Sequence, residues 1–350
     1  MTWKDCALGD VITLKRGHDL PERKRVPGPI PVVSSSGISG SHNEPKANPP
    51  GVVTGRYGTI GEVFFVEEPY WPLNTALYVI DFKGNDPRFI AYFLRNILRN
   101  YKTEKAAVPG VDRNVLHALR VRAPSPNEQT AVVSILSAYD DLIENNRRRI
   151  ALLEEAARLL YREWFVHFRF PGYEHVKISN DLPEGWKHQE IGQLIELKYG
   201  KALKQGDRTK GIFPVYGSSG IIGYHHAALV EGPAIVVGRK GNVGSIYWSP
   251  VSFWPIDTVY FVPKEYVDFW IYLMLPSVGL QNTDTGVPGL NRDFSYSRKL
   301  ILPPANLRRQ FNEAVEPMFS QRTILENYNQ RLAQARDLLL PRLMNGQITI

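Results

Sequence analysis

The sequence has only one cysteine, Cys6, among its 350 residues. A single cysteine cannot form an internal disulfide or a cysteine-rich zinc site, which is typical of proteins from a reducing compartment. Long apolar runs are also missing, because the longest, Phe269 to Leu275, is far shorter than the roughly 20 residues that cross a bilayer. The first ten residues lack the charged and apolar regions of a signal peptide. We therefore expect a cytoplasmic chain without a membrane partner.

The composition is that of a folded, soluble chain, with 43% hydrophobic and 22% charged residues. A length of 350 residues exceeds what one hydrophobic core usually supports, so at least two domains are expected. The formal net charge of +7 favours a polyanionic partner, and nucleic acid is the first candidate.

The chain is a tandem repeat, which is the first property to look for in any sequence. The segment Ile30–Gly40 recurs as Phe213–Gly223, 183 residues later, with seven of eleven positions identical. Other segments repeat at the same offset or, after a four-residue deletion, at 179: Leu8–Gly17 as Ile191–Gly200, Gly55–Gly61 as Gly238–Gly244, Trp71–Thr75 as Trp254–Thr258, and Val108–Asn114 as Val287–Asp293. The sequence therefore predicts two similar half-molecules.

Each half begins with a β-rich globule. Short apolar runs such as Val11–Leu14 and Val63–Val66 lie between Gly, Pro and Asn clusters, which is typical of strands joined by tight turns. One helix is predicted within each globule, at Pro87–Tyr101 and at Glu265–Leu275.

Each half ends with a long helix. Residues 128–164 contain no Gly or Pro, and Ser125 to Glu128 form a capping box with Pro126 at the first helical position. Residues at alternating spacings of three and four predict a coiled-coil seam. The first seam is Ile135, Tyr139, Leu142, Asn146, Ile150, Leu153, Ala157, Leu160 and Trp164. The second seam is Ala314, Met318, Gln321, Leu325, Tyr328, Leu332, Ala335 and Leu339, and Pro317 is expected to kink its helix.

These elements predict an α+β protein. Two β-rich mixed α/β globules are related by pseudo-twofold symmetry and separated by two long antiparallel helices that form a coiled coil. The predicted boundaries are 1–126 for the first globule, 127–170 for the first helix, 171–305 for the second globule with its leading linker, and 306–350 for the second helix.

No catalytic or metal motif is convincing. Asn48-Pro-Pro-Gly51 lacks the aromatic fourth residue of DNA amino-methyltransferases. Glu196 and Lys198 after Asp181 are spaced as in metal-dependent nucleases, but Thr13 occupies the position of Glu196 in the first copy. Gly238–Gly244 is not a Walker loop, and the eight histidines show no ligand spacing. We expect no catalytic residue, no metal site and no cofactor in this chain.

The chain resembles the specificity (S) subunits of type I restriction-modification enzymes over essentially its whole length. The most specific elements are Leu182-Pro-Glu-Gly-Trp186, the Ser-Ser-Gly and Gly-Arg-x-Gly turns of both copies, and the helix entry Pro124–Gln129. Glu163-Trp-Phe165 belongs to the same pattern. Leu307-Arg-Arg-Gln310 departs from it, because two arginines precede the Gln.

The resemblance implies a non-catalytic DNA-binding subunit. Each globule would be a target recognition domain for half of a bipartite, asymmetric site in double-stranded DNA. The helices would dock two modification (M) subunits, which use S-adenosylmethionine, and restriction (R) subunits, which use ATP and Mg, would join them. Helix residues predicted to bind a partner are Leu153, Leu160, Trp164, Leu325, Leu332 and Leu339.

Candidate DNA-binding residues are cations and polar groups at the turns, where they can contact phosphates. In the first globule they are Lys15, Arg16, Arg23, Lys24, Arg25, Ser35, Arg56, Tyr57, Thr59 and Arg113. In the second they are Lys198, Lys201, Lys204, Arg208, Ser218, Arg239, Lys240, Asn242 and Arg292.

Comparison of the two copies distinguishes residues that support the fold or bind phosphates from residues that contact bases. If the halves bind different sequences, residues shared by both copies should fold the domain or hold phosphates. Arg56 and Arg239 belong to this class, whereas Tyr57 and Lys240 differ and are predicted to contact bases. Thr59 and Asn242 also differ, as do His18-Asp19 and Lys201-Ala202. Two alternatives remain open: a methyltransferase or nuclease built on the same repeat, and a coiled-coil adaptor that binds acidic protein.

Overall fold

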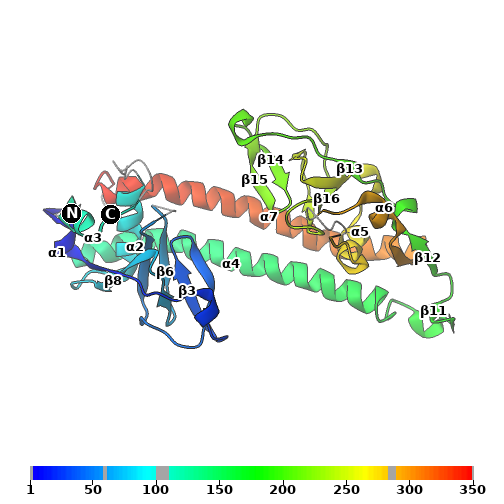
Figure 1. Cartoon of the computed structure of the whole chain (residues 1–350), viewed down its shortest axis with the longest axis horizontal. Helices are drawn as coiled ribbons and strands as arrows, with labels where there is room; N and C mark the ends of the chain where they lie inside the picture. Colours follow the sequence, from blue (N-terminus) through cyan, green and yellow to red (C-terminus); the bar gives the residue numbers. More distant parts are fainter. Residues whose placement is uncertain (1–2, 58–60, 100–109, 283–288, 349–350) are drawn as a thin grey trace. The chain divides into compact units, whose positions relative to one another are not determined.

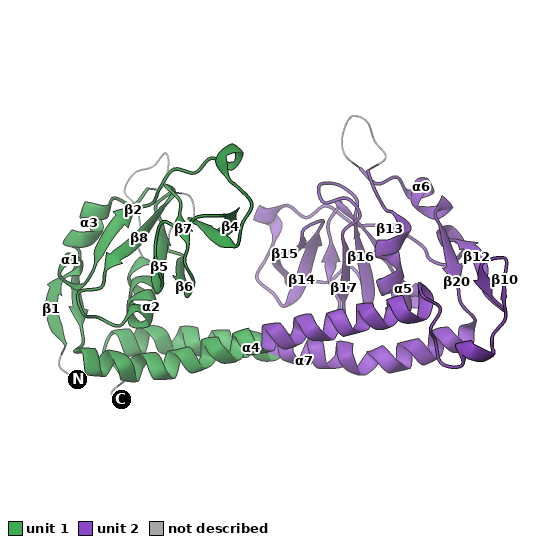
Figure 2. Ribbon diagram, turned by 90° about the horizontal axis from the view of Figure 1, so that it is seen from below, with its two compact units in different colours: residues 1–145, 328–350 green, residues 146–327 purple. Residues whose placement is uncertain are grey.

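The computed structural model describes residues 3–57, 61–99, 110–282 and 289–348, and Figure 1 shows its elements along the chain. The chain forms two compact units, residues 1–145 with 328–350 and residues 146–327 (Figure 2). The long helices α4 (Pro126–Phe165) and α7 (Ala305–Met344) each contribute one part to each unit.

The first unit carries a four-stranded antiparallel sheet in the order β2-β8-β5-β6, a three-stranded sheet β4-β3-β7, and the pair β1-β9. Its strands are β1 (Lys4–Ala7), β2 (Thr13–Arg16), β3 (Ile30–Ser34), β4 (Gly37–His42), β5 (Gly51–Gly55), β6 (Val63–Val66), β7 (Trp71–Pro72), β8 (Ala76–Asp81) and β9 (Arg120–Ala123). Its short helices are α1 (Leu8–Val11), α2 (Pro87–Leu98), α3 (Arg113–Ala118) and the 3-10 helix η1 (Glu22–Lys24).

The second unit repeats this topology, with sheets β13-β19-β16-β17 and β15-β14-β18 and the pair β12-β20. Its strands are β10 (Ile178–Ser179), β11 (Leu182–Pro183), β12 (Lys187–Glu190), β13 (Lys198–Tyr199), β14 (Phe213–Gly217), β15 (Gly220–His225), β16 (Ala234–Gly238), β17 (Ile246–Ser249), β18 (Trp254–Pro255), β19 (Val259–Val262) and β20 (Lys299–Leu302). Its helices are α5 (Phe269–Met274) and α6 (Arg292–Ser297), with 3-10 turns η2 (Tyr173–His175), η3 (Ile191–Gln193), η4 (Gln205–Asp207), η5 (Lys264–Tyr266) and η6 (Leu275–Val278).

Shared glycines explain why the two copies fold alike. Gly17 and Gly200 lie where a Cβ would stand 2.1 Å from the carbonyl oxygens of Leu73 and Ile256. No other residue fits at that distance, so the crossing of these segments requires glycine in both copies.

The helices α4 and α7 pack antiparallel within each unit, as predicted. In the first unit, Val132 and Leu136 of α4 share a core with Leu340 and Leu343 of α7. In the second, the Phe165 and Phe311 rings lie 4.9 Å apart, and Arg322 Nε lies 3.2 Å from Glu154 Oε1. As the residue number rises along α4, the number of the contacting residue in α7 falls, which is the pattern of antiparallel helices. The two β-rich globules and the antiparallel coiled coil confirm the predicted α+β fold.

The predicted seam is wrong by one residue in places. Leu142 is 48% exposed whereas Ile143 is buried, and Ala314 is exposed whereas Val315 is buried. The reason is that each long helix buries one face against the other long helix and a second face against a globule. In the first unit, for example, the Tyr92 hydroxyl of α2 donates to Asp140 of α4 at 2.6 Å. A strict heptad pattern of apolar residues describes only the face that a helix turns toward one partner helix. Pro317 lies inside α7, which continues through it from Ala305 to Met344.

The shorter helices also differ from the prediction. The helix predicted at Glu265–Leu275 begins only at Phe269, because the Asp268 carboxylate caps it by accepting from the Ile271 amide at 2.8 Å. The described part of the helix predicted at Pro87–Tyr101 ends at Leu98. The capping box at the start of α4 is confirmed, since the Glu128 carboxylate accepts from the Ser125 amide at 2.9 Å. None of the helices in the described ranges has the length and apolar content to span a membrane.

Candidate nucleic-acid interface

In the second unit, two arginines meet at one end of the four-stranded sheet. Arg239 directly follows β16, and its amide donates to the Thr258 carbonyl at 2.9 Å. Its own carbonyl accepts from the Leu290 amide at 2.8 Å, which brings the start of α6 beside it. Arg292 is the first residue of α6, and the Asn291 side chain caps this helix. Backbone hydrogen bonds therefore place both arginines together.

An aromatic platform holds these two guanidinium groups. They lie 5.5 Å (Arg239) and 5.4 Å (Arg292) from the centre of the Tyr199 ring, which is 53% exposed. Tyr199 packs edge-to-face on Tyr260 at 4.9 Å. The Tyr260 hydroxyl donates to the Leu290 carbonyl at 3.0 Å, and burial raises the pKa of this hydroxyl, so it stays a neutral donor. Arg239 Nε and Nη2 donate to the Asp257 carbonyl at 3.2 and 2.6 Å, so the donors that remain are Arg239 Nη1 and the Arg292 guanidinium, an arrangement suited to phosphate oxygens.

The first unit builds the same backbone frame with different side chains. The Arg56 amide donates to Thr75 at 2.9 Å, and its carbonyl accepts from Val111 at 2.8 Å. The Arg56 guanidinium lies 4.5 Å from the centre of the neighbouring Tyr57 ring. Arg113 begins α3.

The two frames differ at two places. Arg16 stands where the second unit has Tyr199, and Tyr57 stands where it has Lys240. The backbone frame around the predicted pair Arg56/Arg239 is thus the same in both copies, and in the second unit Tyr199 joins Arg239 to Arg292.

Several predicted residues line the adjoining turns. Tyr57 is 41% exposed, and Lys240 and Asn242 are exposed as well. The Ser218 hydroxyl accepts from the Asn242 amide at 3.4 Å, and the Ser35 amide donates to the Thr75 hydroxyl at 3.4 Å. Both serines therefore support the arginine-bearing turns. Thr59 lies outside the described residues.

Two predicted phosphate contacts have a structural role instead. Arg25 Nη1 donates to the Ser39 carbonyl at 2.7 Å, and Arg208 Nη1 donates to the Ile222 carbonyl at 2.9 Å. Both arginines are half-buried, and each fixes the same hairpin, β3–β4 or β14–β15, in its own copy. Their hydrogen bonds favour a scaffold role over contact with DNA.

The remaining predicted cations are exposed. Arg16 Nη2 lies 3.8 Å from Asp19, and Lys198 Nζ lies 3.5 Å from Glu196. Lys15 lies in β2, and those on the segments leading to β3 and β14 are Arg23, Lys24, Lys201 and Lys204.

The sequence analysis missed two pairs of residues that the repeat could have identified. His42 and His225 are buried, and the Nδ1 atom of each accepts from a backbone amide at 3.1 Å. His117 Nε2 accepts from the Leu14 amide at 2.9 Å, and the Tyr296 hydroxyl accepts from the Leu197 amide at 2.8 Å. Each pair lies at the repeat offset. Within the described ranges, no three His, Cys, Asp or Glu residues gather as a metal site would require.

The predicted partner-binding residues are largely covered by the chain itself. Leu325 is only 3% exposed, and Leu160 and Trp164 pack against the core of the second unit. Leu153, Leu332 and Leu339 are half-buried. The exposed apolar residues of the two helices are different ones: Leu142, Leu152 and Leu159 of α4, and Ile324, Tyr328 and Leu338 of α7. Only Leu159 and Leu338 among these are related by the repeat offset.

Comparison with known proteins identifies the family. The model of the type I restriction modification DNA specificity domain matches residues 1–155 and 183–306, well over half of the chain. The chain belongs to this family. The matched family and the similar proteins are named for specificity, which confirms the predicted resemblance to specificity subunits.

Similar members of the specificity family come from distant organisms. The MjaIX specificity subunit of Methanocaldococcus jannaschii is 24% identical over 69% of this chain and 63% of its own length. The MjaVIII specificity subunit of that organism is 21% identical over 54% of this chain and 38% of its own length. The chain thus spans less than two thirds of these relatives. An S subunit of a type I system from M. genitalium shares the fold, with a TM-score of 0.58 at 17% identity over 98% of this chain and 96% of that one.

Proposed function

We propose that this chain recognises a bipartite, asymmetric sequence in double-stranded DNA, one half with each globule. The observation that carries the proposal is the pair of arginine clusters. Both copies hold two arginines in the same backbone frame, and exposed side chains that differ between the copies stand among them. Shared arginines suit the phosphates, which are the same in any sequence, and differing neighbours suit two different half-sites.

The test of DNA recognition is a salt titration of duplex binding. Arg239→Ala or Arg56→Ala should weaken binding to all sequences alike and reduce the slope of log K against log salt by about one per lost phosphate contact. Arg208→Ala is the matched control, because its guanidinium donates both Nη atoms to carbonyls, those of Ile222 and Leu203, and it should leave the slope unchanged. Binding that does not depend on salt would instead support a coiled-coil adaptor for acidic protein.

We further propose that two M subunits dock on the long helices, one at Leu159 and one at Leu338. Identical partners need identical surfaces, and these two leucines are exposed by 47% and 68% at equivalent positions of the repeat. The M subunits would carry S-adenosylmethionine and methylate adenine, whereas R subunits would bring ATP and Mg. In this scheme the chain itself binds no cofactor and works in the cytoplasm.

Docking can be measured as the number of M subunits bound per chain. Leu159→Asp should reduce this number from two to one, and adding Leu338→Asp should abolish binding. Leu152→Arg is a matched control, because Leu152 is exposed but Arg331 occupies the equivalent position. Two bound M subunits in the double variant would refute this surface. With M present, mapping of methylated adenines in genomic DNA would then give both half-sites.

A further inference from the structure

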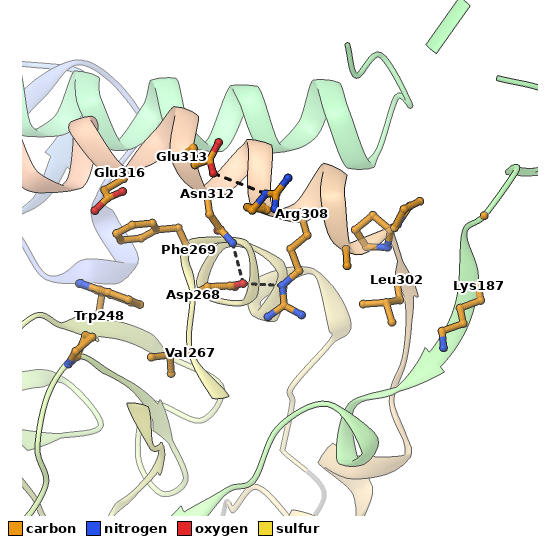
Figure 3. Close-up of a pocket in the computed structure, with 16 residues that line it drawn as sticks. Lys187, Trp248, Val267, Asp268, Phe269, Leu302, Arg308, Asn312, Glu313 and Glu316 are labelled. Carbon is orange, nitrogen blue, oxygen red and sulfur yellow. Dashed lines mark hydrogen bonds and ion pairs between the residues drawn. The ribbon is translucent and has the colours of Figure 1, made fainter. Parts of the chain in front are cut away.

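The second unit contains an open groove that is separate from the arginine cluster, because neither Arg239 nor Arg292 lines it. Its volume is about 850 Å³, and it lies between β17, the segment before α5 and the first turns of α7 (Figure 3). One end is lined by Trp248, Phe269 and Glu316, and the other by Lys187, Leu302 and the start of α7.

The floor of the groove is a stack of aromatic rings. The Trp248 ring lies 4.8 Å from Phe269, and Phe269 stacks on Phe319 of α7 at 4.3 Å. Trp248 is 91% buried, since only 9% of its surface is exposed. Its indole Nε1 makes no hydrogen bond with any described residue. A rigid floor with one unused donor is therefore present.

The charges in the middle of the groove are already satisfied. Asp268 Oδ2 accepts from Arg308 Nε at 2.6 Å and from Asn312 Nδ2 at 2.8 Å, as Figure 3 shows. The Arg308 guanidinium also lies over the Trp270 ring at 4.9 Å. A ligand gains little by competing with this closed network.

Two carboxylates at the Trp248 end remain available. Glu313 lies 3.8 Å from Arg309, but both side chains are more than 60% exposed, so this ion pair is weak. Glu316, one turn later, has no ion-pair partner among the described residues, and it lies above Trp248 in Figure 3. The groove thus combines an aromatic floor, an indole donor and an acidic rim.

The acidic rim belongs to the second unit alone. α4 and α7 are both 40 residues long, so their positions correspond at an offset of 179. Ser134 and Ser137 of α4 stand where α7 has Glu313 and Glu316, and Phe65 stands where the second unit has Trp248. A partner that bound both copies alike would need the same residues in each. The groove therefore suits a partner that binds once per chain.

The groove is also unsuited to DNA. Lys187 and Arg309 also line it, but Glu313 and Glu316 at its Trp248 end would repel phosphates, and it lies at the far end of β16 from the arginine cluster. Pro233 borders the groove, whereas Arg239 follows the last residue of β16. Six residues of extended chain, at about 3.3 Å each, separate these two ends by about 20 Å.

We propose that this groove binds an extended, basic segment of a partner protein. An arginine or lysine stem of the segment would lie on Trp248 and Phe269, with its charge at Glu316 and Glu313. A main-chain carbonyl of the segment would accept from the Trp248 indole. An extended segment has such a free carbonyl, whereas carbonyls inside a helix are already bonded.

Fluorine NMR of the full chain labelled with 5-fluorotryptophan tests this proposal. The chain has seven tryptophans, and the resonance lost in Trp248→Phe belongs to Trp248. The probe is a blocked ten-residue peptide of alternating arginine and proline, and its control replaces each arginine by glutamate. We expect the basic peptide to shift the Trp248 resonance in a saturable way and the acidic peptide to leave it in place.

Charge variants then identify the rim. Glu313→Gln with Glu316→Gln should weaken peptide binding at least tenfold, whereas Glu174→Gln with Glu190→Gln, which changes two exposed carboxylates elsewhere in this unit, should not. The rim variant should keep its melting temperature and its affinity for duplex DNA, which separates this proposal from DNA recognition. No Trp248 shift at millimolar peptide, an equal shift with the acidic peptide, or displacement of the peptide by duplex DNA would overturn it.

Discussion

The two units use different chemistry in the same helix pair. In the first unit, α4 and α7 meet through aliphatic residues, Val132 and Leu136 against Leu340 and Leu343. In the second, Phe311 of α7 is surrounded by aromatic rings of α4, with Tyr161 at 6.2 Å and Phe165 at 4.9 Å. The antiparallel scaffold therefore does not depend on one kind of apolar side chain.

An ion pair accompanies the seam in each unit. Arg336 of α7 pairs with Asp140 of α4 in the first unit, and Arg322 pairs with Glu154 at 3.2 Å in the second. The arginines are largely buried, with 18% and 16% of their side chains exposed. Burial lowers the pKa of both arginines, but the nearby carboxylates outweigh it and leave the pKa raised, so they stay charged. Buried charged pairs are one way to specify a helix register when the apolar residues differ.

The largest expected effect tests the aromatic seam. Phe311→Ala should lower the free energy of unfolding of the second unit by about 3–5 kcal/mol, because a fully buried ring is replaced by a cavity. Leu136→Ala, a truncation in the aliphatic seam of the first unit, should cost about 2–5 kcal/mol. Urea unfolding of both variants measures the difference. A loss below about 1 kcal/mol for Phe311→Ala would show that the aromatic cluster does not support this unit.

The junction between globule and helix should give the next largest effect. In the first unit buried Gln129 accepts from the Asp86 amide at 3.0 Å, and in the second Arg308 occupies the equivalent position and binds Asp268. Arg308→Ala should cost about 1–3 kcal/mol, because Asp268, 23% exposed, loses its charged donor. Arg308→Gln, which introduces the residue of the first unit, should recover part of this loss in thermal unfolding. Equal losses for both variants would contradict the equivalence.

Exchanging Tyr57 and Lys240 should alter the sequence preference of both globules. Lysine can donate to guanine O6 and N7, whereas tyrosine can stack or contact a thymine methyl. The double variant Tyr57→Lys, Lys240→Tyr should lose about ten- to a hundredfold in preference for its half-sites, equivalent to roughly 1–3 kcal/mol. Competition between cognate and substituted duplexes measures this. If the methylated motif is unchanged, the bases are contacted by other residues, and the segments 17–28 and 200–211 become the candidates.

The smallest expected effect is a difference in acid sensitivity. Burial, and then Arg113 and Lys83, lower the pKa of His117, whereas in the second unit the Tyr296 hydroxyl accepts the equivalent hydrogen bond. As pH falls below the ordinary histidine value of about 6.5, the unfolded chain binds this proton first, so the first unit loses stability. His117→Tyr should reduce the fall in melting temperature between pH 7.5 and pH 5.5, and the reduction should be less than about 2–4 °C.

The reciprocal variant Tyr296→His should transfer this acid sensitivity to the second unit. Hydrogen exchange of the Leu14 and Leu197 amides, read at both pH values, separates the two units. Protection of Leu197 that does not respond to pH in Tyr296→His would show that this hydrogen bond is not coupled to protonation.

The repeat made most of the fold predictable from the sequence. Glycines such as Gly17 and Gly200 recur because the chain crosses itself there, so matching segments had to fold alike. The phase of the long helices was less predictable. Each helix contacts both its partner helix and a globule, and the apolar pattern alone does not separate these two faces. This is why Leu142 was assigned to the seam in place of Ile143.

The site was predictable by residue type but not by geometry. Arg56 and Arg239 lie in the clusters as expected, but Arg25 and Arg208 bind carbonyl groups of their own hairpins. Both kinds of arginine are shared between the copies and flank glycine-rich turns. The hydrogen bonds distinguish them, because Arg208 donates both Nη atoms to carbonyls, of Ile222 and Leu203, whereas Arg239 donates Nε and Nη2 to the Asp257 carbonyl and keeps Nη1.

The first unit joins residues 1–145 to residues 328–350, whereas the second is one continuous stretch. A ribosome therefore finishes every residue of the second unit before it makes the last helix turns that the first unit needs, among them Leu340 and Leu343. The first globule therefore keeps part of its apolar surface exposed until residues 328–350 have been synthesised. A chain truncated after residue 327 should accordingly protect the second unit from protease and leave α2 and the first half of α4 open to cleavage or to chaperones.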